Sequence, residues 1–198
     1  AWISADKARN EREIQSLVRL AKAGLVDVAA VGNEVLLRNE LSEQEIIQYL
    51  QQVRRQVPAP IPVTYVDAYY HFLDKPQLVA ACDVVLINCY PFWEGAAIDQ
   101  ALSYLQQMYG LAKAAAGDKP VIIAETGWPS EGQSVMSAQP SAENAMKNFI
   151  NVQHWARTEQ IDLFYFSSFD ETWKVRQEGA VGAKWGLWDK NEQPKYGF

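Results

Sequence analysis

The sequence predicts an α/β fold built from parallel strands, either a closed barrel or a doubly wound sheet. Near-continuous apolar runs of strand length alternate with longer stretches in which apolar residues recur at helical spacing. No glycine-rich phosphate loop follows any of these runs, which weakens the nucleotide-binding version of the doubly wound sheet. No repeat, linker or low-complexity stretch divides the chain, so we expect one domain, residues 1–198.

Strands and helices alternate from the start of the chain. Short apolar runs bounded by polar or turn residues predict strands at 1–4, 26–33, 62–67, 84–90, 120–125 and 162–170. Apolar residues three and four positions apart predict helices at 10–23, 41–57, 74–81, 96–116 and 141–158. Two helices also have start signals, because Ser42 and Glu45 have capping-box spacing and Pro140 with Ser141 introduces the last helix.

The composition excludes some partners and favours others. The net charge of −6 argues against a nucleic-acid partner, which would require a basic face. No apolar run approaches the length of a membrane span. The seven Trp and nine Tyr are many for 198 residues, and flat apolar rings are surfaces on which sugars stack. Core packing accounts for part of them, so the count alone does not assign a ligand.

The cysteines and histidines predict neither a disulfide framework nor a metal centre. Cys82 and Cys89 are too few for a disulfide scaffold, and Cys89 lies in a predicted strand, so we expect two buried free thiols rather than a bridge. His71 and His154 have no second ligand at metal-binding spacing. We therefore expect no metal and no cofactor.

Polar and aromatic side chains gather where four of the predicted strands end. The carboxyl ends of parallel strands meet on one face of the fold, which is where barrel enzymes build their sites. The opposite strand ends, such as "DKP" and "PIP", are plain turns. The residues at the carboxyl ends are Asn33, Glu34, Tyr90, Phe92, Trp93, Glu125, Asp170 and Glu171.

Two of these residues, Glu34 and Glu125, end apolar strands and have aromatic side chains nearby. Either glutamate alone is most simply a solvated or turn-capping residue, but the pair suggests cleavage of a glycosidic bond. That reaction uses one carboxylic acid and one carboxylate, and a separation of about 5–5.5 Å predicts retention of configuration. Asn33 is suited to bond the sugar's 2-hydroxyl. A divalent-cation site is the alternative, disfavoured because no Asp or His clusters beside the pair.

Five segments resemble glycoside hydrolase family 17 in sequence and in order: "VGNE", "NCYPFW", "ETGWPS", "FDETWK" and "KWGLW". That family includes plant β-1,3-glucanases and related bacterial and fungal β-glucan transferases. "NE" alone is a weak signal, whereas "ETGWPS" with "FDETWK" is specific, and the resemblance spans nearly the whole chain. It implies a (β/α)8 TIM barrel, of which about six β/α units, the third to the eighth, are present in this chain.

The resemblance also implies roles for individual residues. Glu34 is then the acid/base and Glu125 the nucleophile. The candidates for substrate binding, in or behind the sugar subsites, are Asn33, Tyr65, Tyr90, Phe92, Trp93, Trp128, Asp170, Glu171, Trp173 and Lys174. Because a buried ring cannot stack on a sugar, we expect partial exposure of Tyr90, Phe92, Trp93, Trp128 and Trp173.

The expected function is that of a retaining glycosidase or transglycosylase that cleaves β-1,3-glucan through a covalent glycosyl-enzyme intermediate. A glucanosyltransferase is slightly favoured, because the short loops around "YPFWEG" resemble those of the bacterial-type members. The alternatives are an endo-β-1,3-glucanase and an inactive glucan-binding fragment. Because glucan polymers occur there, we expect a periplasmic or extracellular location. We also expect the natural protein to begin earlier and to supply the first two β/α units.

Overall fold

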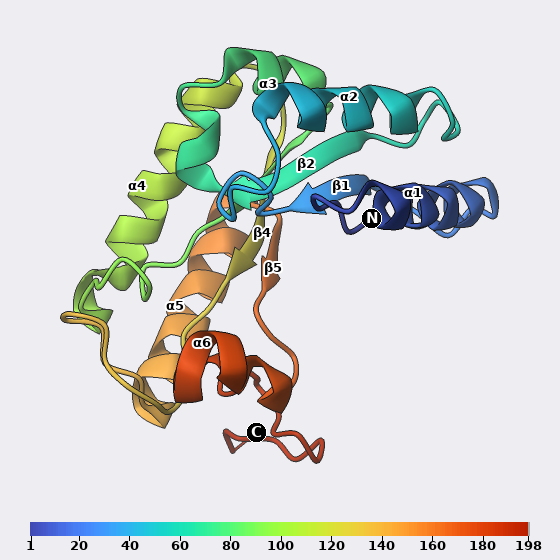
Figure 1. The fold of residues 1–198 in the computed structure, drawn as a ribbon. Coiled ribbons are helices and arrows are strands. Elements are labelled where there is room, and N and C mark those ends of the chain that lie inside the picture. The colour runs from blue at the N-terminus through green and yellow to red at the C-terminus, as the bar shows by residue number, and fades with distance from the viewer. Residues whose placement is uncertain (198) are drawn as a thin grey trace. The chain divides into compact units, whose positions relative to one another are not determined.

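A computed structural model describes residues 1–197 as two compact units (Figure 1). Unit 1 comprises residues 1–88 and 109–122, and unit 2 comprises residues 89–108 and 123–197. The chain crosses between the units after Asn88, inside helix α4 (Ile98–Ala116) and inside strand β4 (Val121–Thr126). In both units strands pair in parallel and alternate with helices, which confirms the predicted α/β class.

Unit 1 is built on three parallel strands. β1 (Ala29–Asn33) pairs with β2 (Val63–Ala68), and β2 pairs with β3 (Val85–Asn88). Every residue of β2 is buried, as expected of a parallel strand with neighbours on both edges. Between and before these strands lie α1 (Lys7–Lys22), α2 (Glu43–Arg54), the 3-10 helix η1 (Tyr69–Phe72) and α3 (Pro76–Ala81).

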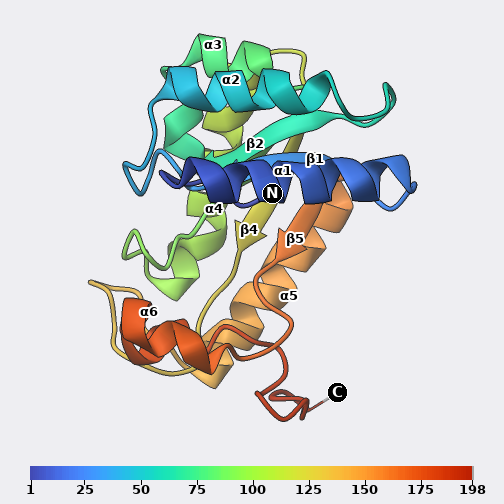
Figure 2. The ribbon, with the colours of Figure 1, turned by 45° about the vertical axis from the view of Figure 1, so that its right-hand side comes forward.

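The helices of unit 1 cover the strands with the apolar faces that the sequence predicts. In α2, Ile46, Leu50 and Val53 recur at helical spacing and are almost fully buried, and the helix contacts β1 and β2. α1 buries Ile14 and Val18 and lies beside β1 in both ribbon views (Figures 1 and 2). The core of unit 1 therefore lies between its sheet and these helices.

α2 begins with the predicted capping box. The Ser42 side chain accepts a hydrogen bond from the Glu45 N–H, and the Glu45 carboxylate accepts one from the Ser42 N–H at 2.9 Å. Hydrogen bonds from the Ser42 backbone and side chain lower the pKa of the Glu45 carboxyl. The cap is therefore strongest when Glu45 is ionised.

Substitution Ser42→Ala is expected to lower the free energy of unfolding by about 1 kcal/mol, measured by urea denaturation near neutral pH. Because the pKa of Glu45 is lowered by folding, its contribution is present above the unfolded pKa and is lost as the pH falls through the folded pKa. The difference between wild type and variant should thus shrink below about pH 4. Ser103→Ala, which removes a hydroxyl inside α4, is the control, and an equal loss there would contradict the capping role.

Unit 2 contains the end of β4 paired in parallel with β5 (Leu163–Tyr165). α5 (Ala142–Glu159) runs beside β5 in both ribbon views (Figures 1 and 2), and the rings of Phe149 and Tyr165 meet edge to face with centroids 4.9 Å apart. The Ser141 side chain caps α5 as predicted. Two elements that the sequence did not predict follow, the 3-10 helix η2 (Thr172–Lys174) and α6 (Val175–Gly182).

Two predicted strands are wrong in whole or in part. Residues 1–4 form no regular strand, because only Ala1 exchanges backbone hydrogen bonds with β1 and the Ser4 N–H turns to the Asn10 side chain. The strand expected at 162–170 is only β5. The Phe166 N–H still donates to the Thr126 carbonyl of β4, but the N–H groups of Ser167 and Asp170 donate to the carbonyls of Trp185 and Trp188.

The two cysteines are buried free thiols, as the sequence predicts. Burial raises the pKa of Cys82 and of Cys89, so both remain neutral at physiological pH. They therefore pack as small apolar side chains within their own units.

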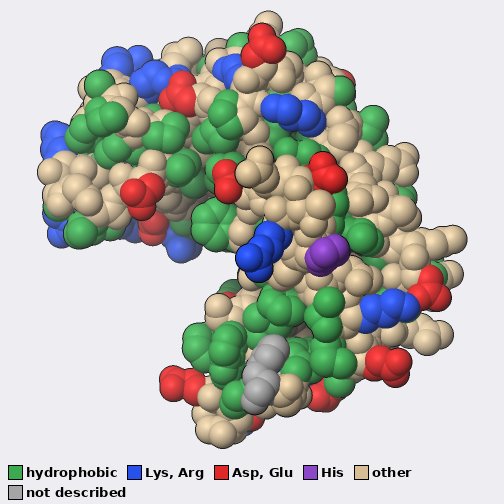
Figure 3. Space-filling model, turned by 180° about the vertical axis from the view of Figure 1, so that it is seen from behind, with side chains coloured by type: hydrophobic (Ala, Val, Ile, Leu, Met, Phe, Trp, Pro, Cys, Tyr) green, Lys and Arg blue, Asp and Glu red, His purple; other side chains and the backbone are tan. Residues whose placement is uncertain are grey.

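Surface charge is mixed on the face that Figure 3 shows. Acidic and basic side chains are scattered there among apolar ones, and no single basic area covers that face. Within residues 1–197, no helix combines the length and the apolar character that crossing a membrane requires.

Candidate active site

Glu34 follows a bulge in β1. Between Ala30 and Asn33, β1 advances three residues while β2 advances two. Gly32 makes the bend with φ of 87°, and a Cβ added there would lie 2.9 Å from Val35 Cγ2. Glu34 itself has φ of 55°, which is uncommon for a residue other than glycine. The bulge and the turn thus take Asn33 and Glu34 out of the regular alternation of the strand.

The Glu34 carboxylate is held by the side-chain amide of Asn88, the last residue of β3. Asn88 Nδ2 donates to Glu34 Oε1 at 2.9 Å and to Asn33 Oδ1 at 3.1 Å. The Asn33 carbonyl accepts a further hydrogen bond from Arg38 Nη1 at 2.7 Å. Asn88 is buried, whereas Asn33 and Glu34 are partly exposed. In unit 1, the partly exposed carboxylate of Glu34 therefore lies beside the amide of Asn33, and the buried Asn88 side chain bonds both.

Tyr65 and Asp67 of β2 anchor the turn that carries Glu34. The Leu36 N–H donates to the Tyr65 hydroxyl at 2.9 Å and to Asp67 Oδ2 at 3.1 Å, and the Tyr65 hydroxyl donates to the same carboxylate. Burial, and then the charge of Asp67, raise the pKa of Tyr65, so the phenol keeps its proton. The Tyr65 ring is fully buried. It cannot stack on a sugar, and its role is to support the turn instead of the predicted contact with substrate.

Glu125 occupies the corresponding place in unit 2. Between Ile123 and Thr126, β4 also advances three residues while β5 advances two. The Tyr90 hydroxyl donates to Glu125 Oε2 at 2.7 Å, and the Glu125 carbonyl accepts from the Cys89 N–H at 2.8 Å. The segment that begins at Cys89 is therefore bonded to both the backbone and the carboxylate of Glu125.

Gly127 takes the chain sharply out of β4. A Cβ added there would lie 2.0 Å from the Phe166 carbonyl oxygen, so only glycine fits without a shift of the backbone. The chain then enters Trp128, whose Nε1 donates to the Gln139 carbonyl at 3.0 Å. Both the ring and its polar atom are therefore committed to contacts inside unit 2.

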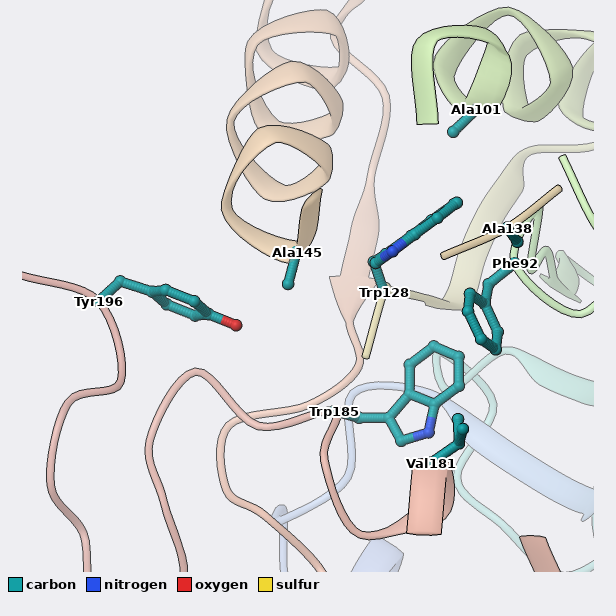
Figure 4. Packing of buried hydrophobic residues seen from close by; sticks show 8 residues of the cluster. All are labelled: Phe92, Ala101, Trp128, Ala138, Ala145, Val181, Trp185 and Tyr196. Atoms are coloured by element: carbon teal, nitrogen blue, oxygen red, sulfur yellow. The ribbon is translucent and has the colours of Figure 1, made fainter. Parts of the chain in front are cut away.

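Phe92 and Trp128 belong to the buried aromatic core of unit 2 (Figure 4). Phe92 is 0% and Trp128 1% exposed, so the prediction that both would be partly open to a sugar is wrong. The two rings meet edge to face at 5.2 Å, and Phe92 meets Trp185 at 5.6 Å. The cluster consists of Phe92, Ala101, Trp128, Ala138, Ala145, Val181, Trp185 and Tyr196.

Sequence reasoning missed two residues of the site, Trp185 and Asn88. The Trp185 ring meets Tyr90 edge to face at 5.2 Å and so supports the residue that bonds Glu125. The segment "KWGLW" was the available signal, but it has no periodicity to show which indole faces the core. For Asn88 the available signal was one amide residue directly after the apolar run "VVLI".

Trp93 and Trp173 remain open among the substrate-binding candidates, with 39% and 62% of their surface exposed. Tyr90 is partly exposed. Lys174 Nζ lies 2.9 Å from Glu171 Oε2 and 4.0 Å from the centroid of the Phe166 ring. These side chains provide ring surfaces and an ion pair in unit 2 that a sugar could contact.

Asp170 makes structural contacts inside unit 2. Its carboxylate is buried, and its Oδ1 accepts hydrogen bonds from the Gly186 N–H at 3.0 Å and from Lys195 Nζ at 2.7 Å. The Asp170 N–H also donates to the Trp188 carbonyl. Asp170, which lies after β5, is therefore hydrogen-bonded to the segment that follows α6.

The amide of Asn88 donates to the Glu34 carboxylate, and the phenol of Tyr90 donates to the Glu125 carboxylate. Carboxyl side chains can exchange a proton or attack an electrophilic carbon. Among the described residues 1–197, no three His, Cys, Asp or Glu side chains are grouped so as to hold a metal ion.

The chain is similar to glycan-active proteins over most of its length. The sequence profile of the family described as "BtgE/BtgC glycoside hydrolase domain" matches residues 1–186. An active-site mutant of the Rhizomucor miehei β-1,3-glucanosyltransferase, solved in complex with laminaritriose, superposes with a TM-score of 0.89 at 34% identity. The match covers 98% of this chain and 72% of that one, and it confirms the predicted fold class.

Two curated fungal relatives show the same similarity. A glucan 1,3-beta-glucosidase of Arthroderma benhamiae is 29% identical over 198 residues, which cover 90% of this chain and 64% of the relative. A probable family 17 glucosidase of Saccharomyces cerevisiae, SCW4, is 29% identical over 171 residues, which cover 82% of this chain and 42% of the relative. The chain thus spans less than two thirds of the length of these two relatives.

Proposed function

The chain belongs to the BtgE/BtgC glycoside hydrolase family, of the family 17 type, and from this premise we propose that it acts on β-1,3-glucan. We propose a retaining reaction through a covalent glycosyl-enzyme intermediate, with Glu34 as acid/base and Glu125 as nucleophile. The relatives named as a glucan 1,3-beta-glucosidase and a β-1,3-glucanosyltransferase support this class of substrate.

One observation carries the proposed roles. Each glutamate follows or lies in a bulge at the carboxyl end of a parallel strand, and each carboxylate accepts a hydrogen bond from a neutral donor. Strand ends of this kind hold catalytic residues in parallel α/β enzymes, because the sheet fixes the backbone while the side chain faces outward. A retaining glycosidase uses two carboxyl groups, and here each lies at the carboxyl end of a parallel strand.

The proposed reaction has two steps, and Glu34 and Glu125 supply every protein group that they require. In the first, Glu125 attacks C1 of the sugar, the C1–O bond breaks and Glu34 gives its proton to the departing oxygen. In the second, Glu34 takes a proton from water or from a sugar hydroxyl, whose oxygen attacks C1 and releases Glu125. Each step inverts C1, so the configuration is retained overall. A carboxyl separation of about 5–5.5 Å stays a prediction of this mechanism.

We favour transfer to a sugar over hydrolysis as the second step. The 34% identical relative from Rhizomucor miehei is a glucanosyltransferase, and the exposed Trp93 and Trp173 offer ring surfaces for an acceptor sugar. Hydrolysis is the alternative, favoured by the name of the Arthroderma benhamiae relative. A glucan-binding domain without activity is a third candidate, and the two glutamates argue against it.

Product analysis distinguishes these functions. The full-length protein is incubated with laminaripentaose in ¹⁸O-labelled water, and the products are followed by mass spectrometry. Transfer is expected to give oligosaccharides longer than the substrate, with unlabelled reducing ends, before shorter labelled products accumulate. Labelled shorter products alone would establish hydrolysis. Binding of laminaripentaose without any product would contradict both enzymatic functions.

A further inference from the structure

β3 ends in a buried polar residue that packing alone does not explain. Val85, Leu86 and Ile87 are buried apolar residues, and Asn88 follows them with 3% of its surface exposed. Within residues 1–197, Asn88 Oδ1 has no hydrogen-bond partner. A buried carbonyl oxygen without a partner costs stability, and such groups occur in native proteins chiefly where they serve a further purpose.

The amide nitrogen of Asn88 is directed to the candidate site. Nδ2 bonds both Glu34 Oε1 and Asn33 Oδ1, at 2.9 and 3.1 Å. Ala68, in register with Asn88 at the end of the intervening strand β2, carries only a methyl group. Asn88 therefore reaches past β2 to the side chains of Asn33, which ends β1, and Glu34, which follows it, and a single amide bonds both.

We propose that Asn88 is a positioning residue that fixes Glu34 for proton transfer. The inference rests on the acid/base role proposed above. Because Glu34 Oε1 accepts the Nδ2–H, the proton of the carboxylic acid belongs on Oε2, so the bond selects which oxygen delivers it. The same amide holds Asn33 Oδ1, which fixes the plane of the neighbouring amide. Loss of Asn88 frees the carboxyl group to rotate.

Asn88→Leu tests this because leucine keeps the approximate size and removes the donor. In the full-length protein, kcat/KM on a laminari-oligosaccharide is expected to fall about 10- to 100-fold, as for a misplaced catalytic group. On 2,4-dinitrophenyl β-laminaribioside, kcat/KM should change less than about threefold, since dinitrophenolate departs without a proton. Asn88→Asp, which has the same shape and no amide donor, should show the same difference between the two substrates in the loss of kcat/KM.

Two controls make the outcomes separable. Asn148→Leu removes another buried amide, one that donates to the Tyr165 hydroxyl at 3.3 Å, and should leave the ratio of the two kcat/KM values unchanged. Glu34→Gln should show the same dependence on the leaving group as Asn88→Leu, but larger. If Asn88→Leu lowers kcat/KM equally for both substrates, or for neither, Asn88 does not position Glu34, and the proposed function stands. If Glu34→Gln shows no such dependence, the role of Glu34 fails and this inference fails with it.

Discussion

Glu125→Ala is expected to lower β-1,3-glucan turnover by the full-length protein about 10⁴-fold or more, because it removes the proposed nucleophile. Glu34→Ala should lower it by about 10²–10⁴-fold, since the leaving oxygen still departs slowly without an acid. Initial rates on laminari-oligosaccharides measure both. Glu131→Ala removes an exposed glutamate of unit 2 that pairs with Lys184, and it should keep the wild-type rate.

Azide assigns the two roles independently of rate. In Glu125→Ala azide can occupy the space of the lost carboxylate and attack C1 directly, so the glycosyl azide should have inverted configuration. In Glu34→Ala the intermediate on Glu125 still forms, and azide then attacks it, so the product should have retained configuration. Substrates with a dinitrophenyl leaving group allow both experiments, and NMR of the azides identifies the anomers. The opposite pair of anomers would exchange the roles of Glu34 and Glu125. Turnover at the wild-type rate in both variants would show that neither residue has a catalytic role.

Trp128→Ala is expected to lower the free energy of unfolding by about 3–5 kcal/mol, because it empties the centre of the aromatic core of unit 2. The indole is 1% exposed, meets Phe92 edge to face and donates to the Gln139 carbonyl. Urea denaturation of the full-length protein measures the loss. Most of the lost stability comes from packing and one hydrogen bond, so the variant should bind glucan normally wherever it remains folded.

Trp173→Ala is the matched substitution at an open position. With 62% of its surface exposed, the indole contributes little to the core, and its loss should change stability by no more than about 0.5 kcal/mol. If Trp173 contacts substrate, oligosaccharide binding should weaken, as isothermal titration calorimetry would show. A large loss of stability at Trp173 and none at Trp128 would reverse this interpretation of the two indoles.

Features that depend on residues close together in the chain could be predicted from the sequence. The capping box of Ser42 and Glu45 needs only a three-residue spacing, and the structure confirms it. The apolar runs before Glu34 and Glu125 likewise form parallel strands whose carboxyl ends hold both residues. The α/β class and the family resemblance follow from such local patterns and from their order, and both are confirmed.

Features that depend on distant contacts could not be predicted. An indole packed on Phe92 and an indole facing solvent look the same in a one-dimensional pattern, so Trp128 and Trp173 were both expected to be open. The strand expected to continue to residue 170 ends at Tyr165, because from Ser167 onward the backbone N–H groups bond to Trp185 and Trp188 instead of β4.

The positions of the two strand-terminal glutamates, on which the proposed chemistry rests, were therefore predictable from the sequence, since hydrophobic periodicity and strand direction place such residues without knowledge of their neighbours. Their hydrogen-bond donors were not. Asn88 lies 54 positions from Glu34, and Tyr90 lies 35 positions from Glu125. Register between strands, with a methyl group at Ala68 and a bulge in β1, brings Asn88 to Glu34, and side-chain register of that kind arises only when the chain folds.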